Sequence, residues 1–257
     1  MRKSGLLMIL LLASTAGTVW LLREPLANAW GKTKGGVDLG FRRKFQPDPE
    51  KYGVLIKDLD RWRVDLAERH RKARNRAGRE AVEHDARVIL EQCLPEMMRC
   101  WLGTPWDFNG TAGEPGSGKI ACGYFVATVL KDAGFRVDRY QLAQQPSENI
   151  LRSFLPKESC ALTIGKNYQA FAGDVAKLES GIYVIGLDTH VAFIVVRNGD
   201  FRFIHSSGSS PWCVVDEEPA DAIVLQRSNW RMLGNLTGAP GVIRTWLKAD
   251  KITVRGT

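Results

Sequence analysis

The chain has 257 residues, of which 44% are hydrophobic, and it carries a net charge of +8 with an isoelectric point near 9.4. This apolar content is sufficient for the core of one ordinary domain with some additional segments. The positive charge favours an anionic partner, such as a lipid surface or a polyanionic cell envelope. No DNA- or RNA-reading motif accompanies the charge, so nucleic acid ranks last among these partners.

The N-terminal segment has the pattern of an export signal. Arg2 and Lys3 precede an uncharged run, residues 4–22, and Ala27-Asn-Ala29 offers a small-x-small cleavage pattern. We predict a signal over residues 1–29, cut after Ala29. The run is also long enough to span a bilayer, so an uncleaved membrane anchor is the alternative. In both cases the body is expected outside the cytoplasm, in the periplasm or cell envelope, with membrane contact confined to this segment.

A linker and a long helix are predicted next. Residues 30–51, which are rich in Gly, Lys and Arg, are interpreted as the linker. The helix runs from Tyr52 to about Arg76, and Gly78 interrupts it. Its apolar residues recur at helical spacing and form one narrow stripe: Leu55, Leu59, Trp62 and Leu66.

A second helix is predicted from Arg79 to about Cys93, and Pro95 is expected to begin a short third helix. We interpret residues 52–94 as a helical attachment that packs on the body of the protein through the apolar stripe. Two histidines lie on the charged surface of these helices and are expected to be solvated rather than catalytic: His70 and His84.

The body is assigned to residues 95–232, followed by a C-terminal tail of little pattern, residues 233–257. A helix is predicted from about Glu148 to Phe154. Beyond Gly181 the apolar periodicity changes from helical to alternating, which is typical of strands. Five strands are predicted: Ile182–Leu187, His190–Arg197, Asp200–His205, Cys213–Val215 and Ala222–Gln226.

A cysteine stands where a glycine-rich loop becomes an apolar helix. The loop covers Gly110 to Gly118, and the helix is predicted to begin at Cys122 and to end at Ala133-Gly134. Unpaired backbone N–H groups at a helix N-terminus favour a thiolate, the nucleophilic form of cysteine. A low thiol pKa is therefore expected here. The alternative interpretation is a small buried residue at a helix start.

Two histidines are predicted to lie together on one face of a hairpin. Asn198-Gly199 is a strong signal for a two-residue turn, which pairs Arg197 with Asp200. Counting back from this turn places His190 and His205 on the same sheet face as diagonal neighbours. A thiolate at a helix start and such a histidine pair are the components of a cysteine acyl-transfer site. In this hypothesis Cys122 is the nucleophile, His190 the general base and acid, and His205 the residue that orients it.

The remaining chemistry in the sequence predicts no metal site and no cofactor. The cysteine count is odd and no C-x-x-C spacing occurs, so a zinc site is not expected and the disulfide pairing stays open. The five cysteines are Cys93, Cys100, Cys122, Cys160 and Cys213. Gly113 to Lys119 approaches a phosphate-binding loop, but Ile120 stands where the magnesium-binding hydroxyl should be. Nucleotide binding is therefore not expected.

Four motifs in order resemble the NlpC-type cell-wall cysteine peptidases, a family with a papain-like fold, over about residues 97–232. Leu102-Gly-Thr-Pro-Trp106, followed by Asn109-Gly110, resembles the family's Leu-Gly-Thr-Pro-Tyr loop with its closing glycines. Cys122-Gly-Tyr-Phe-Val126 resembles its Cys-Ser-Gly-Phe-Val helix start. His190-Val-Ala-Phe193 and Phe203-Ile-His-Ser206 resemble the strands that carry its histidine and its third polar residue.

The resemblance implies an α+β fold with a papain-like core, in which the nucleophile helix packs on an antiparallel sheet. It also implies hydrolysis of an amide in peptidoglycan stem peptides by Cys122, His190 and His205, with Trp106 and Tyr124 at the substrate. Peptidoglycan or its peptide fragments, within an anionic envelope, would then be the partner. The chain departs from the family where Asp-Cys-Ser-Gly becomes Ala121-Cys-Gly-Tyr124. Two alternatives stay open: a thiol amidase or acyltransferase on another amide, and a catalytically inactive envelope-binding module.

Overall fold

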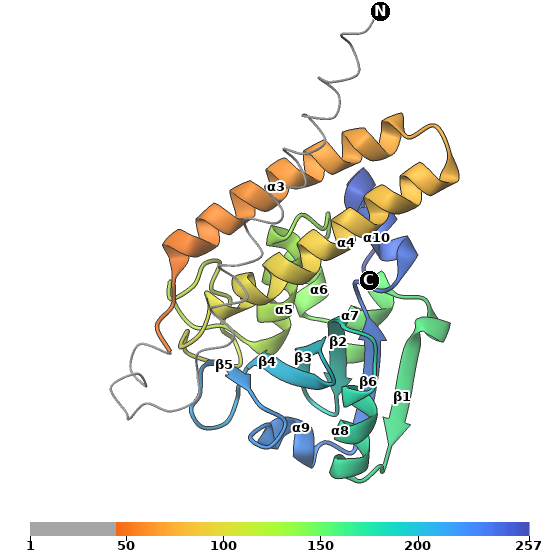
Figure 1. Ribbon diagram of the computed structural model, residues 1–257. Coiled ribbons are helices and arrows are strands. Elements are labelled where there is room, and N and C mark those ends of the chain that lie inside the picture. The colour runs from red at the N-terminus through yellow and green to blue at the C-terminus, as the bar shows by residue number, and fades with distance from the viewer. Residues whose placement is uncertain (1–44, 257) are drawn as a thin grey trace, which may run out of the picture. The chain divides into compact units, whose positions relative to one another are not determined.

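The structure, a computed structural model, describes residues 45–256, which belong to one compact unit (Figure 1). The predicted export signal, residues 1–29, and residues 30–44 of the predicted linker lie outside the described residues. Among the residues that are described, no helix is both long and apolar enough to cross a bilayer.

The unit is α+β, with eight α-helices and one six-stranded antiparallel sheet in the described part of the chain. In chain order the helices are α3 (Pro49–Lys72), α4 (Arg76–Arg99), α5 (Cys122–Asp132), α6 (Arg139–Ala143), α7 (Ser147–Phe154), α8 (Tyr168–Ala176), α9 (Ile223–Arg227) and α10 (Pro240–Lys248). The strands are β1 (Cys160–Ile164), β2 (Gly181–Leu187), β3 (Val191–Arg197), β4 (Asp200–Ser206), β5 (Val214–Glu217) and β6 (Trp230–Asn235).

Two long helices, α3 and α4, form an antiparallel pair along one side of the unit (Figure 1). The Asp48 side chain caps α3 by accepting a hydrogen bond of 2.9 Å from the Lys51 N–H. Of the predicted apolar stripe, Leu59 and Leu66 are fully buried, while the other two members are partly buried. The stripe therefore faces the core, as the sequence predicts.

The break between these helices falls at residues 73–75, so the prediction of a break at Gly78 is wrong. The Asn75 side chain accepts a hydrogen bond of 2.8 Å from the Gly78 N–H, and this cap starts α4 before the glycine. The predicted third helix at Pro95 is also wrong, because α4 continues through the proline. Pro95 leaves the Glu91 carbonyl without its helical donor, and Arg197 donates to that carbonyl instead at 2.5 Å.

The two histidines of this helix pair have different environments. His84 is exposed, as expected. His70 is buried, which contradicts the expectation that it is solvated, and its Nε2 lies 3.0 Å from Glu83 Oε1 on α4. His70 therefore joins the ends of α3 and α4.

The sheet has the strand order β1-β6-β2-β3-β4-β5, and its central part is a meander of consecutive hairpins from β2 to β5. The predicted turn between β3 and β4 is confirmed: Arg197 pairs with Asp200, and Asn198 and Gly199 have φ angles of 52° and 77°. These positive φ angles are those of the two-residue turn that matches the twist of a hairpin. Four of the five predicted strands are present, at close to the predicted bounds.

The fifth predicted strand, Ala222–Gln226, is wrong because this segment forms helix α9. Ala222 and Leu225 are both fully buried against the same cluster, and their spacing of three residues is helical. Five residues are too few to distinguish this spacing from alternation.

The predicted tail, residues 233–257, is also wrong, because it completes β6 and forms α10. β6 lies between β1 and β2, two strands that are far from it in the sequence. α10 packs against α3 and α4, and its Trp246 indole donates to the Ala133 carbonyl at 2.7 Å. Non-local partners of this kind leave little signal in the local pattern.

The two sheet faces bury separate apolar clusters. The larger cluster lies between the sheet and the helices α3, α4, α5, α7 and α10, and it includes the ring contact between Phe125 of α5 and Phe193 of β3, whose centroids are 5.9 Å apart. The smaller cluster lies on the opposite face under α8 and α9. α5 is thus held on one face of the sheet, against β3 and β4.

α6 packs directly on the first turn of α5 at Gly123. A Cβ atom added to Gly123 would lie 2.3 Å from the Ala143 carbonyl oxygen, far inside van der Waals contact. The glycine at this position therefore allows the two helix backbones to approach each other.

We expect Gly123→Ala to lower the free energy of unfolding by about 1–3 kcal/mol, because the new methyl group has to displace backbone. Gly173→Ala is the matched control, since nothing lies within 4 Å of a Cβ added there in α8. That change should raise the free energy of unfolding by ~0.5–1 kcal/mol. Urea denaturation measures both, and equal effects of the two substitutions would contradict the packing argument.

Candidate functional site

Cys122 is the first residue of α5, as predicted. The chain that leads into it is tied down at three points. Ile120 N–H donates to the Pro105 carbonyl and Ala121 N–H donates to the Gly110 carbonyl, both at 2.9 Å. The Ser206 hydroxyl at the end of β4 donates to the Ile120 carbonyl at 2.7 Å. These bonds fix the start of α5 beside the end of the β3–β4 hairpin.

The environment of the Cys122 thiol opposes ionisation. Burial raises the pKa of the thiol above its ordinary value, and it outweighs the backbone N–H groups of Val191, Gly123 and Cys122 itself, which act to lower that pKa. The expectation of a lowered thiol pKa is therefore wrong. Donors at a helix start do surround the sulfur, but desolvation is the larger effect.

The two histidines of the hairpin meet, which confirms the predicted common face. His190 Nε2 lies 2.8 Å from His205 Nδ1, and the two ring planes are close to perpendicular at 87°. Paired residues of β3 and β4 extend from Arg197↔Asp200 back to Phe193↔Ile204. The histidines lie beyond this paired part, where the ends of the two strands are joined through side chains.

The histidine rings and α5 approach the strand ends from different faces of the sheet. His205 packs against Phe203 at a ring-centroid distance of 4.3 Å, on the face covered by α8. The Cys122 sulfur meets the backbone N–H of Val191, the residue that follows His190. The sulfur therefore lies beside the backbone at the first residue of β3. Among the described residues no hydrogen bond joins the Cys122 sulfur to the His190 ring. His190 Nε2 is hydrogen-bonded to His205, so Nδ1 is the ring nitrogen that remains available to a thiol.

A third side chain, Glu217, extends this arrangement and was missed by the sequence interpretation. His205 Nε2 lies 3.0 Å from Glu217 Oε2, and the His205 side chain is fully buried. Glu217 is the last residue of β5 and pairs with Phe203, which places it diagonally next to His205. The predicted strand ended at Val215. Extending its alternation by two residues against β4 would have found Glu217.

Burial sets the ionisation of these three groups. It lowers the pKa of His190 well below the ordinary value, helped by neighbouring His205, and it lowers the pKa of His205 to about 3. It raises the pKa of Glu217 to about 7, with Asp221 as the next largest cause. Both histidines are thus neutral near pH 7, while Glu217 changes its charge there.

The two residues expected at the substrate lie on opposite sides of Cys122 in the sequence and in different surroundings. Trp106 forms a bridge with Ile120, its backbone N–H donates to the Trp212 carbonyl at 2.8 Å, and its ring lies tilted by 51° against the exposed Trp212 ring, with centroids 5.4 Å apart. Tyr124 turns towards α6, where Tyr140 packs edge-on against it at 5.9 Å. Trp106 therefore flanks the segment that leads into Cys122, whereas Tyr124 belongs to the α5–α6 contact.

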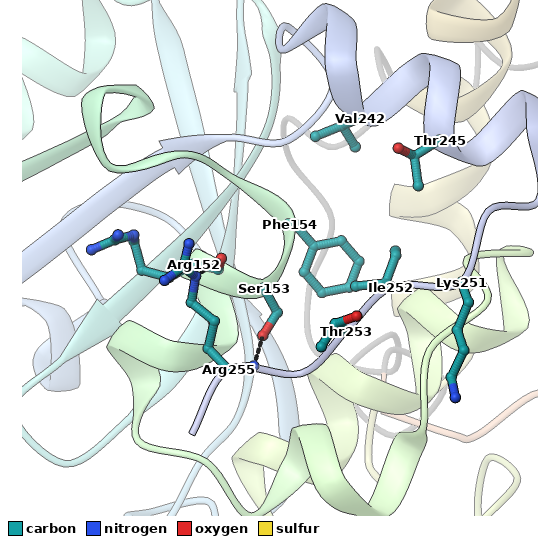
Figure 2. A pocket seen from close by; sticks show the side chains of 9 residues that line it. All are labelled: Arg152, Ser153, Phe154, Val242, Thr245, Lys251, Ile252, Thr253 and Arg255. Atoms are coloured by element: carbon teal, nitrogen blue, oxygen red, sulfur yellow. Dashed lines mark hydrogen bonds between the residues drawn. The ribbon is translucent and has the colours of Figure 1, made fainter. Parts of the chain in front are cut away.

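A pocket of about 370 Å³ lies elsewhere, between α7, α10 and the C-terminal segment. Figure 2 shows Arg152 and Arg255 at one end of it and Lys251 at the other. None of Cys122, His190 and His205 is among its lining residues.

All five cysteines are free thiols in the structure. Within residues 45–256, no group of three or more His, Cys, Asp or Glu side chains is arranged to hold a metal ion. The candidate site therefore consists of protein groups: a thiol, two imidazoles and a carboxyl group.

We expect the Cys122 thiol of the folded chain to alkylate at higher pH than the same thiol in the urea-unfolded chain, because burial disfavours the thiolate. Iodoacetamide labelling followed by mass spectrometry of the Cys122 peptide gives the two pH profiles. A folded-state profile displaced to lower pH would contradict this account of the thiol.

Comparison of the chain with family models, with curated proteins and with solved structures found no match.

Proposed function

We propose that this chain is a cysteine hydrolase that cleaves an amide bond through a thioacyl intermediate, with Cys122 as nucleophile, His190 as general base and acid, and His205 as the residue that orients His190. The observation that carries the proposal is the hydrogen bond between His190 and His205, because the residue after His190, Val191, directs its backbone N–H at the Cys122 sulfur. A hydrogen-bonded base beside a thiol at a helix start is the arrangement that cysteine acyl transfer requires.

The first step in this mechanism transfers a proton as the new bond forms. Cys122 and His190 are both neutral at rest, since burial raises the pKa of the thiol and lowers that of the imidazole. His190 Nδ1 takes the thiol proton while the sulfur attacks the substrate carbonyl carbon. The imidazolium then gives this proton to the departing amine, and the carbon–nitrogen bond breaks to leave a thioester on Cys122. Water, deprotonated by His190, hydrolyses the thioester and restores the thiol.

The first turn of α5 supplies donors for the negative oxygen that develops during attack. The first N–H groups of a helix have no carbonyl partner within the helix. Those of Cys122 and Gly123 already lie close to the sulfur. A carbonyl carbon bonded to this sulfur would place its oxygen beside them, in a partly buried site where such donors are effective.

The proposed substrate is a stem peptide of peptidoglycan, and the proposed location is the periplasm or cell envelope. The four motifs that resemble NlpC-type peptidases, the export-like residues 1–29 and the net charge of +8 support this choice. A papain-like core is part of the same proposal, and a helix with an N-terminal cysteine packed on an antiparallel sheet is compatible with it. Trp106, next to the segment that precedes Cys122, is proposed to contact the substrate.

We expect Cys122→Ala to abolish hydrolysis of purified muropeptides, with a loss of more than ~10³-fold in kcat/KM, because the nucleophile is removed. Cys160→Ala is the matched control, since this partly exposed thiol lies on the edge strand β1 and should leave the rate unchanged. Mass spectrometry of the products measures turnover and identifies the bond that is cut.

Two outcomes would contradict the proposal. Full activity of Cys122→Ala would remove the nucleophile from the mechanism, and binding to the wall without turnover by the parent chain would indicate an envelope-binding module. Products in which the acyl group has moved to an added amine in place of water would identify an acyltransferase that uses the same three residues.

A further inference from the structure

A continuous hydrogen-bond chain leads from His190 to a carboxyl group on the edge strand β5. His190 Nε2 and His205 Nδ1 are 2.8 Å apart, and His205 Nε2 and Glu217 Oε2 are 3.0 Å apart. A neutral imidazole has one N–H donor and one acceptor nitrogen, and an ionised carboxylate can only accept. The protonation state at one end of such a chain therefore determines the direction of every hydrogen bond in it.

We propose that Glu217 is a positioning residue for the reaction: its carboxylate fixes the tautomer of His205 and, through His205, that of His190, so that His190 Nδ1 presents a lone pair to Cys122. This inference rests on the proposed function for its catalytic consequence, but the tautomers themselves can be measured without turnover.

The direction follows from counting protons along the chain. When Glu217 is ionised, it accepts a hydrogen bond from His205 Nε2–H, and His205 Nδ1 must then be an acceptor. His190 Nε2 therefore carries the hydrogen, and Nδ1 is free to accept the thiol proton. When Glu217 gains one proton, it can donate to His205 Nε2. His205 then donates from Nδ1, His190 carries its hydrogen on Nδ1, and the base is blocked.

The arginines near Glu217 form their ion pairs with the residues on either side of it, while the Glu217 carboxyl group contacts His205. Residues alternate along β5, so Asp216 points to the opposite face from Glu217, and Glu218 follows the end of the strand. Arg202 binds both of them, with 2.7 Å to Asp216 and 3.0 Å to Glu218, and Arg99 also binds Asp216 at 2.8 Å. The carboxyl group that reaches the buried histidine is thus not the one that the adjacent arginines hold.

The surroundings of Glu217 also set the pH at which its protonation changes the histidine tautomers. The charged and titratable groups that act on Glu217 come from its own strand, from β4, from α8 and from the segment before α9: Asp216, Arg202, His205, Tyr168 and Asp221. A hydrogen bond from His205 favours the carboxylate, but burial is the larger effect and raises the pKa of Glu217 to about 7. The blocked form therefore gains population as the pH falls below 7, and the competent form gains population above it.

The experiment compares the parent chain with Glu217→Gln, Glu217→Asp and Glu218→Gln. Glutamine keeps the shape of the side chain and removes the titration. Aspartate keeps the carboxylate on a shorter side chain. Glu218→Gln is the matched control, because Glu218 is the neighbouring residue, is 68% exposed and binds Arg202 rather than a histidine. Nitrogen-15 NMR of labelled histidines reports which ring nitrogen carries the hydrogen, and kcat/KM against pH reports the catalytic effect.

In the parent and in Glu218→Gln we expect His190 and His205 to carry hydrogen on Nε2 at about pH 8 and to change tautomer as the pH falls through 7. Their kcat/KM should fall over the same range. In Glu217→Gln the tautomers should be independent of pH, the acid limb should disappear, and kcat/KM at about pH 8 should be lower by roughly 10–100-fold, the range known for partners that orient metal-bound histidines. Glu217→Asp should restore an acid limb.

Two results would overturn the inference: hydrogen on Nδ1 of His205 in the parent at about pH 8, or a tautomer profile of Glu217→Gln that superimposes on that of the parent. If the tautomers respond to Glu217 and no thiol-dependent turnover is found with Cys122 intact, then the proposed function fails while the hydrogen-bond chain stands. The NMR measurement thus separates the two failures.

Discussion

The register of the β3–β4 hairpin is the constraint on which the candidate site depends. Asn198 and Gly199 fix Arg197 opposite Asp200, and every pairing from the turn to Phe193↔Ile204 follows from that choice. A shift of one residue would move either histidine to the other face of the sheet. It would break the His190–His205 contact and also displace Ser206, whose hydroxyl holds the segment before Cys122. One turn thus positions both histidines and the segment that leads into Cys122.

Burial rather than local charge governs the chemistry of the site. It raises the pKa of Cys122 and lowers those of His190 and His205, so the thiol and both imidazoles are neutral at rest. In the proposed mechanism the thiol becomes a nucleophile only when His190 takes its proton during attack. In that mechanism the cost of desolvating a thiolate is avoided at rest, and charge develops only when a substrate carbonyl and the donors of α5 can share it.

The sequence was most informative where the partners are close along the chain. The hairpin turn, the start of α5 at Cys122 and the histidine pair all follow from local patterns and were predicted. Glu217 required the register of a third strand, and β6 and α10 required partners far away in the sequence, so local periodicity could not find them. The lowered thiol pKa was wrongly predicted because burial depends on tertiary packing, whereas the helix N-terminus can be read from local sequence. Gly123 looks like a departure from a motif, yet the Ala143 carbonyl explains it.

The most direct measurement of the central claim is the site at which an electrophilic stem peptide attaches to the intact chain. A peptide that carries a carbonyl warhead in place of the scissile amide should form one covalent adduct, on Cys122. Peptide mapping should exclude Cys160 and Cys213, and His190→Ala should slow the reaction strongly because the thiol keeps its proton. Equal labelling of several cysteines, or a rate on Cys122 that does not depend on His190, would contradict the account.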